Sequence, residues 1–221
     1  CIDKIIEQPE LGLLLDMGMG KTAITLTAIE RLVYDYFSVR KVLVIAPLKP
    51  AIETWPAEVE KWDHLKHITI SLVLGNKESR LNALDKDAEL YIVNRENVQW
   101  LVEHYKKKWP FDMVVIDELS SFKSSKAQRF KALKKVRPYI RRIVGLTGTP
   151  SPNGLLDLWS QMYLLDGGET LGKTITSYRE KWFVPDKRNA TTIFSWKTKD
   201  GAEEEIYQKL GHLCLSMKTA D

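Results

Sequence analysis

The sequence predicts an α/β fold with a mostly parallel sheet, and two observations carry that prediction. Six short apolar runs, each suited to a buried strand, alternate with stretches that have helical periodicity. Strands that alternate with helices at this spacing are typical of βαβ units, in which consecutive strands run parallel. Glycine, proline, acidic or hydroxyl residues directly follow several of the runs. Because ligands of such sheets bind beyond the carboxyl ends of the strands, we expect the functional site at that edge.

The six expected strands have an apolar interior and stop at a turn-forming or polar residue. In chain order they cover residues 12–15, 41–46, 69–74, 90–93, 113–116 and 142–146. The second run stops at Pro47, and the third alternates in polarity before Gly75 and Asn76 close it. These patterns predict a sheet that is buried on both faces.

The expected helices have apolar residues at intervals of three or four positions. They cover residues 1–8, 21–37, a segment opened by Pro50, 77–86, 98–104 and 126–136. In the second helix, Ile24, Ala28, Leu32 and Tyr36 share one face, and the segment after Pro50 carries two tryptophans. Each helix would cover one face of the sheet.

The pattern changes beyond Pro150. We expect helices over residues 155–165, 176–182 and 203–210, a polar and basic stretch over 185–201, and a short strand over 214–217. The sequence therefore predicts a main domain over residues 1–165. Residues 166–221 are expected to form a small helical or irregular extension of the same domain.

A glycine-rich turn joins the first strand to the second helix and has the chemistry of a phosphate-binding loop. The residues of this candidate ATP-binding loop are Asp16, Met17, Gly18, Met19, Gly20, Lys21 and Thr22. The two glycines let the backbone approach an anion closely, and the helix start offers N–H groups and a positive dipole end. Lys21 can reach the β- and γ-phosphates of ATP, and the Thr22 hydroxyl can hold Mg²⁺. Leu15 stands where the usual loop template has glycine, so this loop alone leaves the interpretation open.

The fifth strand delivers a pair of acidic residues, Asp117 and Glu118, to the same edge. Asp117 would hold Mg²⁺ through water opposite Thr22, and Glu118 would orient and deprotonate the attacking water. The alternative is an acidic helix cap, which needs no ligand. The phosphate-binding loop, expected on a neighbouring strand, favours the catalytic interpretation.

Two hydroxyls around a glycine follow the sixth strand, at Thr147, Gly148 and Thr149. Their hydrogen bonds could couple the nucleotide site to a neighbouring surface. The alternative is an ordinary polar turn before Pro150.

Composition narrows the class of protein. A hydrophobic content of 44% and a charged content of 28% are typical of soluble globular proteins. A net charge of +4 permits a nucleic-acid partner without requiring one. Cys1 and Cys214 have no metal or disulfide spacing, which predicts free thiols in a reducing, cytoplasmic compartment. There is no signal-peptide pattern and no apolar run long enough for a membrane span.

Taken together, these motifs resemble the Swi/Snf-like branch of the superfamily-two helicases and translocases. Four segments carry the resemblance: Leu15 to Thr22, Val44 to Leu48 with Trp55 and Trp62 downstream, Asp117 to Ser120, and Leu146 to Pro150 with Asn153. The compact size and residues 119–123 look more like phage or prophage members than like large chromatin remodellers. The resemblance implies a three-layer P-loop domain of the RecA-like type, which binds ATP and Mg²⁺ and contacts DNA. It also implies that this is the first domain of a bacterial or phage-encoded protein.

The same resemblance implies where nucleic acid would bind. In the family, the first domain contacts the sugar-phosphate backbone of one nucleic-acid strand. It does so through the segment after the second β-strand and the loop after the fourth β-strand. Here those positions are Pro47, Leu48, Lys49, Asn94 and Arg95. Contacts of this kind go to phosphate and sugar, so the expected partner is double-stranded DNA without sequence preference. The basic residues at 106–108 and 126–135 could assist, although charge runs are more often solvated faces.

Several features depart from the family pattern. Ser120 stands where the family commonly has histidine, and Pro152 where it commonly has glutamine. Without that histidine, the usual coupling between ATP and nucleic acid through its side chain is not expected in the same form. The chain does not begin with Met, and the adenine-contacting motif is expected just ahead of Cys1. A second RecA-like domain with arginine fingers is expected after Asp221. The isolated chain should therefore hydrolyse ATP very slowly.

Other residues have simpler explanations. We expect the tryptophans at 55, 62, 100, 109 and 159 to pack in the core rather than stack on bases. The four histidines, at 64, 67, 104 and 212, show no metal-ligand spacing.

Three functions remain open at this point. The leading hypothesis is the ATP-binding half of an ATP-dependent DNA translocase. The first alternative is a strand-separating helicase or the motor of a restriction system, with the same fold and ATP chemistry. The second, of another class, is a nucleotide-binding regulatory module without hydrolysis, which the presence of Lys21, Thr22, Asp117 and Glu118 argues against.

Overall fold

The computed structural model describes residues 1–148, 154–189 and 193–217, and its centre is a seven-stranded sheet. The strand order is β3-β4-β2-β5-β6-β1-β9, and every neighbouring pair is parallel. The strands are β1 (Glu10–Leu15), β2 (Val42–Ala46), β3 (Ile70–Val73), β4 (Leu90–Asn94), β5 (Met113–Asp117), β6 (Arg142–Thr147) and β9 (Cys214–Met217). The parallel α/β fold expected from the sequence is confirmed.

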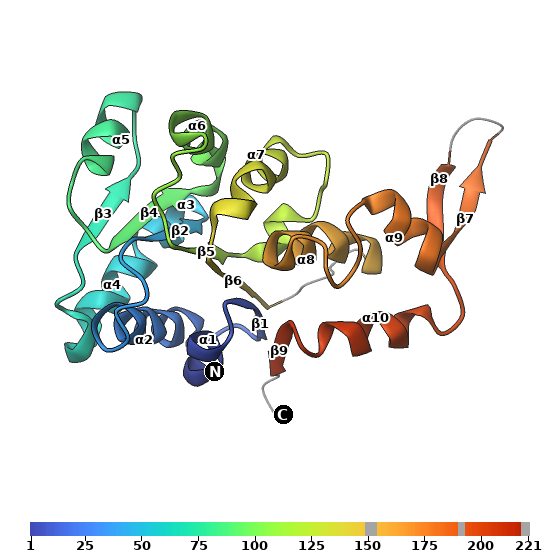
Figure 1. Ribbon diagram of the computed structural model, residues 1–221, viewed down its shortest axis with the longest axis horizontal. Helices are drawn as coiled ribbons and strands as arrows, with labels where there is room; N and C mark the ends of the chain where they lie inside the picture. The colour runs from blue at the N-terminus through green and yellow to red at the C-terminus, as the bar shows by residue number, and fades with distance from the viewer. Residues whose placement is uncertain (149–153, 190–192, 218–221) are drawn as a thin grey trace.

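Helices cover both faces of this sheet (Figure 1). They are α1 (Ile2–Glu7), α2 (Lys21–Tyr34), α3 (Leu48–Ile52), α4 (Thr54–Lys61), α5 (Lys77–Leu84), α6 (Val98–Tyr105), α7 (Gln128–Val136), α8 (Leu158–Asp166), α9 (Ile175–Trp182) and α10 (Ala202–Leu210). No helix within the described residues is long and apolar enough to cross a membrane.

Alternation along the strands divides the core into two clusters, one on each face. In β2, Val42, Val44 and Ala46 pack with α1, α2 and α4, whereas Leu43 and Ile45 pack with the opposite cluster. That opposite cluster contains residues of α6, α7 and α8. All five residues of β2 are buried, as a central parallel strand covered on both faces requires. The result is a three-layer architecture.

Some elements differ from the sequence-based expectation. The helix expected from Pro50 is two helices: α3 already begins at Leu48, and the chain passes through Glu53 into α4. The strand before Asp117 is not beside the loop strand, because β6 lies between β5 and β1. Since β6 comes later in the chain, local sequence patterns contain no information about this insertion.

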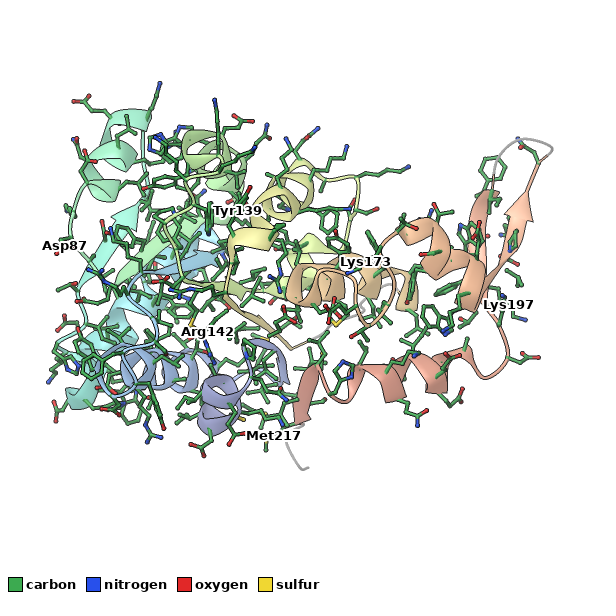
Figure 2. The ribbon with its side chains drawn as sticks, in the orientation of Figure 1. Asp87, Tyr139, Arg142, Lys173, Lys197 and Met217 are labelled. Atoms are coloured by element: carbon green, nitrogen blue, oxygen red, sulfur yellow. The ribbon has the colours of Figure 1, made fainter. Side chains whose placement is uncertain are left out.

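The stretch 185–201, which the sequence analysis describes only as polar and basic, contains most of an antiparallel hairpin of β7 (Phe183–Arg188) and β8 (Ile193–Thr198). Its strands were missed because, among their described side chains, Phe183 alone is buried, so the apolar alternation that predicts strands is absent. The hairpin projects from the end of the molecule at the right of Figure 1. Figure 2 labels Lys197 on the hairpin and Met217 near the C-terminus. The distance between these labels shows how far the chain extends away from the main sheet before it returns to it.

The strand expected over residues 214–217 is present as β9 and pairs with β1. Gly12 allows this close pairing, because a Cβ at that position would lie 2.9 Å from the Cys214 sulfur. The described part of the extension after residue 165 thus ends as an edge strand of the main sheet.

Candidate functional site

The predicted site residues gather where β5, β6 and β1 end side by side. Asp117, the last residue of β5, is opposite Leu146 of β6, and Thr147 of β6 is opposite Leu14 of β1. Because all three strands are parallel, their carboxyl ends share one edge. We call this edge, with residues 16–22, Asp117 to Ser120, Thr147 and Gly148, the rim.

The glycine-rich loop has the backbone that its sequence predicts. Gly18 and Gly20 have φ angles of +82° and +70°, a left-handed region that favours glycine. Gly20 is the N-cap of α2, so the helix begins with Lys21 and directs its first N–H groups into the loop. Met17 is 91% exposed. This loop and helix start can receive an anion.

Lys21 lies back over its own loop. Its ammonium group donates hydrogen bonds to the carbonyl oxygens of Leu15, at 2.7 Å, and Asp16, at 2.9 Å. Leu15, the departure from the usual loop template, is buried in the core and offers its carbonyl to this lysine. The side chain therefore holds a positive charge at the start of α2.

A hollow of about 330 Å³ lies beside the loop. Its lining comes from the loop, from the first turn of α2 and from the end of α4: Gly18, Gly20, Lys21, Thr22, Ala23, Glu58, Lys61 and Trp62. The expectation that Trp62 packs in the core is wrong, since it is 41% exposed and its indole N–H bonds Glu58 at 2.7 Å. Core packing was expected because Trp62 continues the helical spacing of Trp55 and Val59. The helix α4, however, ends at Lys61, one residue before Trp62.

The other tryptophans follow the expectation to different degrees. Trp55 and Trp159 are buried, at 0% and 3% exposure. Trp100 and Trp109 are partly buried and pack against the same cluster as Trp159.

Asp117 is partly buried and accepts a hydrogen bond of 3.0 Å from the indole N–H of Trp55. Burial raises the pKa of Asp117, and the neighbouring Glu118 charge raises it further, while the Trp55 bond and the Lys21 charge act in the opposite direction. A cation beside this carboxylate would relieve both destabilising effects. Trp55 is a site residue that sequence reasoning missed, because its apolar spacing in α4 predicts only core packing.

Glu118 has a φ of +63°, a left-handed conformation unusual for a residue with a side chain. Its carboxylate accepts a hydrogen bond from the Thr147 hydroxyl at 2.8 Å and another from the Ser120 hydroxyl. The following turn is anchored by Leu119, whose side chain fills the space that a Cβ on Gly145 would occupy. The backbone and two hydroxyls therefore fix the direction of this carboxylate.

Ser120 and Thr147 have a specific place in this arrangement. Ser120 is the family departure noted above, and here its hydroxyl bonds Glu118. Thr147 is fully buried, and Gly148 follows it beside the backbone of Leu15 and Met17. Thr149, the third predicted coupling residue, lies outside the described residues.

The positions predicted for nucleic acid lie beside the rim at the ends of β2 and β4, where Ala46 pairs with Asn94. Leu48 and Lys49 are exposed in α3, the side chain of Lys49 by 81%. Asn94 and Arg95 both bond Glu96, at 3.0 Å and 2.9 Å. Pro47 is the N-cap of α3. The structure brings these segments side by side but leaves their role a prediction.

The four histidines are on different elements, each with its own neighbours. His64 bonds Thr27, His67 pairs with Glu30, His104 stacks on Trp100 and His212 bonds Thr170. Within the described part of the chain, no three histidine, cysteine or acidic side chains form a metal-binding group.

Known proteins that are similar to this chain indicate its family. The family model of the SNF2-related domain matches residues 7–217. Protein p41 of Acyrthosiphon pisum secondary endosymbiont phage 1 is 41% identical over 211 residues, 93% of this chain and 46% of that protein. Helicase swr1 of Emericella nidulans is 29% identical over 166 residues, 72% of this chain and 10% of that protein.

Among solved structures, the SWI2/SNF2 ATPase core of Sulfolobus solfataricus in complex with dsDNA is similar in fold, with a TM-score of 0.78. The match covers 100% of this chain and 43% of that one, at 23% identity. The chain thus spans less than half the length of each of these three proteins.

Proposed function

This chain belongs to the SNF2-related domain family, and from that premise we propose that it is the ATP-binding half of an ATP-dependent DNA translocase. It is a Swi2/Snf2-type ATPase domain with a RecA-like fold. The observation that carries the proposal is the meeting of Lys21, Asp117, Glu118 and Thr147 at one rim. Phosphate binding, metal binding and water activation each have a residue there.

In this proposal the loop and Lys21 bind the ATP phosphates. The N–H groups of the glycine loop and the start of α2 supply donors and a favourable dipole. Lys21 exchanges its bonds to the two loop carbonyls for charge-assisted bonds to the β- and γ-phosphates. Because the ammonium group is already held at the loop, this exchange requires only a small movement.

The residues present fit a magnesium ion. Thr22 stands in the first turn of α2 and lines the hollow, and Asp117 is a partly buried carboxylate whose raised pKa reflects burial and the Glu118 charge. Oxygen ligands of these kinds are the ones that Mg²⁺ prefers beside phosphates. When held by these residues, Mg²⁺ would help neutralise the negative charge of the ATP phosphates.

Glu118 is the proposed general base. Thr147 and Ser120 donate to its carboxylate, which leaves it oriented to accept the proton of an attacking water. The arginine fingers that stabilise the transferring phosphate in related chemistry would come from a second RecA-like domain, which is also part of the proposal. In this proposal, the present chain binds ATP and activates the attacking water, and the second domain supplies the arginine fingers.

DNA is the proposed partner along which the complete protein moves. The ends of β2 and β4 present Leu48, Lys49 and Arg95 next to the ATP site, so backbone contact and hydrolysis could be linked over a short distance. The solved relative in complex with dsDNA supports a duplex partner. Contacts to phosphates give little sequence preference and strong salt dependence.

The test is the ATPase rate of the full-length protein with duplex DNA, single-stranded DNA and RNA at fixed salt. The proposal predicts strong stimulation by duplex DNA of any sequence, which weakens as salt rises. Stimulation by single strands alone would favour the strand-separating alternative. No hydrolysis with any nucleic acid would favour the regulatory nucleotide-binding module.

A further inference from the structure

Trp55 connects the acidic end of β5 to the helix pair that follows β2. Its indole N–H donates to the Asp117 carboxylate at 3.0 Å, across 62 residues of sequence. The side chain is fully buried and belongs to the core cluster that contains α2 and β2. Its position is therefore set by packing, and Asp117 receives a donor whose direction is fixed.

The helix that carries Trp55 is joined closely to the segment predicted to contact DNA. The N–H of Glu53 donates to the Lys49 carbonyl at 2.9 Å, and the N–H of Ala57 donates to the Glu53 carbonyl at 3.1 Å. These bonds link α3 to α4 through the one residue between them. Ala51 of α3 is buried in the same cluster as Trp55. A displacement of α3 would therefore also displace the start of α4, where Trp55 lies.

The exposed face of α3 can meet a nucleic-acid backbone. Leu48 and Ile52 are 52% and 49% exposed, and the Lys49 side chain, 81% exposed, forms a long 3.9 Å pair with Glu53. Such exposed pairs contribute little to stability, so Lys49 can exchange its partner for a phosphate. α3 thus has one face toward solvent and one residue, Ala51, in the core.

We infer that Trp55 is a positioning residue that orients Asp117 toward Mg²⁺ and transmits the state of α3 to it. This inference rests on the proposed function. The physical basis is that a donor bonded to a metal-binding carboxylate fixes its direction, and losing such a partner typically lowers metal affinity by about 10- to 100-fold. A shift of α3 on DNA would move the donor and so change the affinity for Mg²⁺. By reciprocity, Mg²⁺ with nucleotide would change the affinity of α3 for DNA by the same factor.

The test is the Trp55→Phe variant of the full-length protein, which keeps an aromatic ring and removes the N–H. A fluorescent ATP analogue is titrated at a series of Mg²⁺ concentrations, with and without duplex DNA. The Mg²⁺ concentration needed for half-maximal binding should rise about ten-fold. The change that DNA causes in this concentration should shrink toward none.

Trp159→Phe is the matched control. Trp159 is also buried, and its indole N–H donates to the Gly172 carbonyl at 2.9 Å, in the opposite core cluster. It loses the same kind of bond away from the rim, so its Mg²⁺ dependence should equal that of the wild type. Binding of the analogue without Mg²⁺ reports whether each variant is folded. If Trp55→Phe does not fold, Trp55→Met offers a more adaptable side chain that also lacks the donor.

The outcomes separate the inference from the proposed function. Wild-type protein that binds no nucleotide at any Mg²⁺ concentration would contradict the proposed function itself. Wild-type binding with an unchanged Mg²⁺ dependence in Trp55→Phe would overturn the positioning role. A raised Mg²⁺ requirement with an unchanged response to DNA would overturn the transmitting role and with it the inference as stated.

Discussion

The rim and the C-terminal hairpin hold their polar groups in different ways. At the rim, Trp55 reaches Asp117 across 62 residues and Thr147 reaches Glu118 across 29. In the hairpin of β7 and β8, Ser195 bonds Asp186 only nine residues away, and Phe194 is 67% exposed. Rim geometry is thus fixed by the whole sheet, whereas hairpin geometry is local. Equivalent substitutions should therefore have large effects on ATP chemistry at the rim and small ones in the extension.

The largest expected difference is between two lysines. Lys21→Ala removes the ammonium group that bonds to two loop carbonyls hold at the phosphate loop, and should abolish detectable ATP binding because the phosphates lose this positive charge. Lys197→Ala removes an exposed charge from the hairpin and should leave affinity unchanged. Calorimetric titration with ATP and Mg²⁺ measures both, and equal affinity in the two variants would remove Lys21 from its assigned role.

A second pair compares two glutamates. Glu118→Gln keeps the shape of the side chain and removes the base, so turnover should fall by about 10²- to 10⁴-fold while ATP binding persists. Glu205→Gln in α10 breaks a 3.2 Å pair with Lys181 in the extension and should leave turnover unchanged. The measurement is DNA-stimulated ATPase activity of the full-length protein. If Glu118→Gln turned over at the wild-type rate, the general base would have to be another group.

A smaller difference is expected between two serines. Ser120→Ala removes one of two hydroxyl donors to Glu118, and turnover should fall by about 10- to 150-fold, because a hydrogen bond to a charged group contributes about 1.5–3 kcal/mol. The loss should appear in kcat rather than KM, and Ser120→Thr should restore most of it. Ser195→Ala in the hairpin should change neither constant. A Ser120→Ala enzyme with unaltered kcat would show that Thr147 alone is sufficient.

The last comparison lies outside the ATP chemistry and tests how firmly the extension returns to the sheet. Burial, with a contribution from Asp166, raises the pKa of the Cys214 thiol to about 12. At pH 8 the folded protein should thus have almost no thiolate at Cys214, whereas the unfolded chain has an ordinary thiol pKa of about 8.5. Iodoacetamide should modify Cys214 at least ten times more slowly in folded than in urea-unfolded protein. Similar rates would mean that β9 is only loosely paired with β1.

The sequence predicts the body of this molecule better than its extension, for physical reasons. Buried parallel strands are continuous apolar runs, so β2, β4, β5 and β6 could be located within a residue or two. In the β7–β8 hairpin, Phe183 alone among the described side chains is buried, so no such pattern appears. The insertion of β6 between β5 and β1 is a tertiary fact that no local pattern contains.

The same reasoning applies to the site. Lys21, Thr22, Asp117 and Glu118 could be chosen because glycine turns and acidic pairs at strand ends have a direct chemical meaning. Trp55 and Ser120 could not be assigned their contacts, since an indole at core spacing and a serine in a turn both have ordinary explanations. Trp62 shows the opposite error, in which helical spacing continued one residue beyond the end of α4.

The central claim, that this chain binds ATP but depends on a second domain for hydrolysis, has one direct test. Single-turnover hydrolysis is compared between residues 1–221 and the full-length protein, each saturated with ATP, Mg²⁺ and duplex DNA. The account predicts that the isolated chain binds ATP yet hydrolyses it about 10³- to 10⁵-fold more slowly, the range that arginine fingers contribute in related chemistry. Equal rates for the two proteins would contradict it.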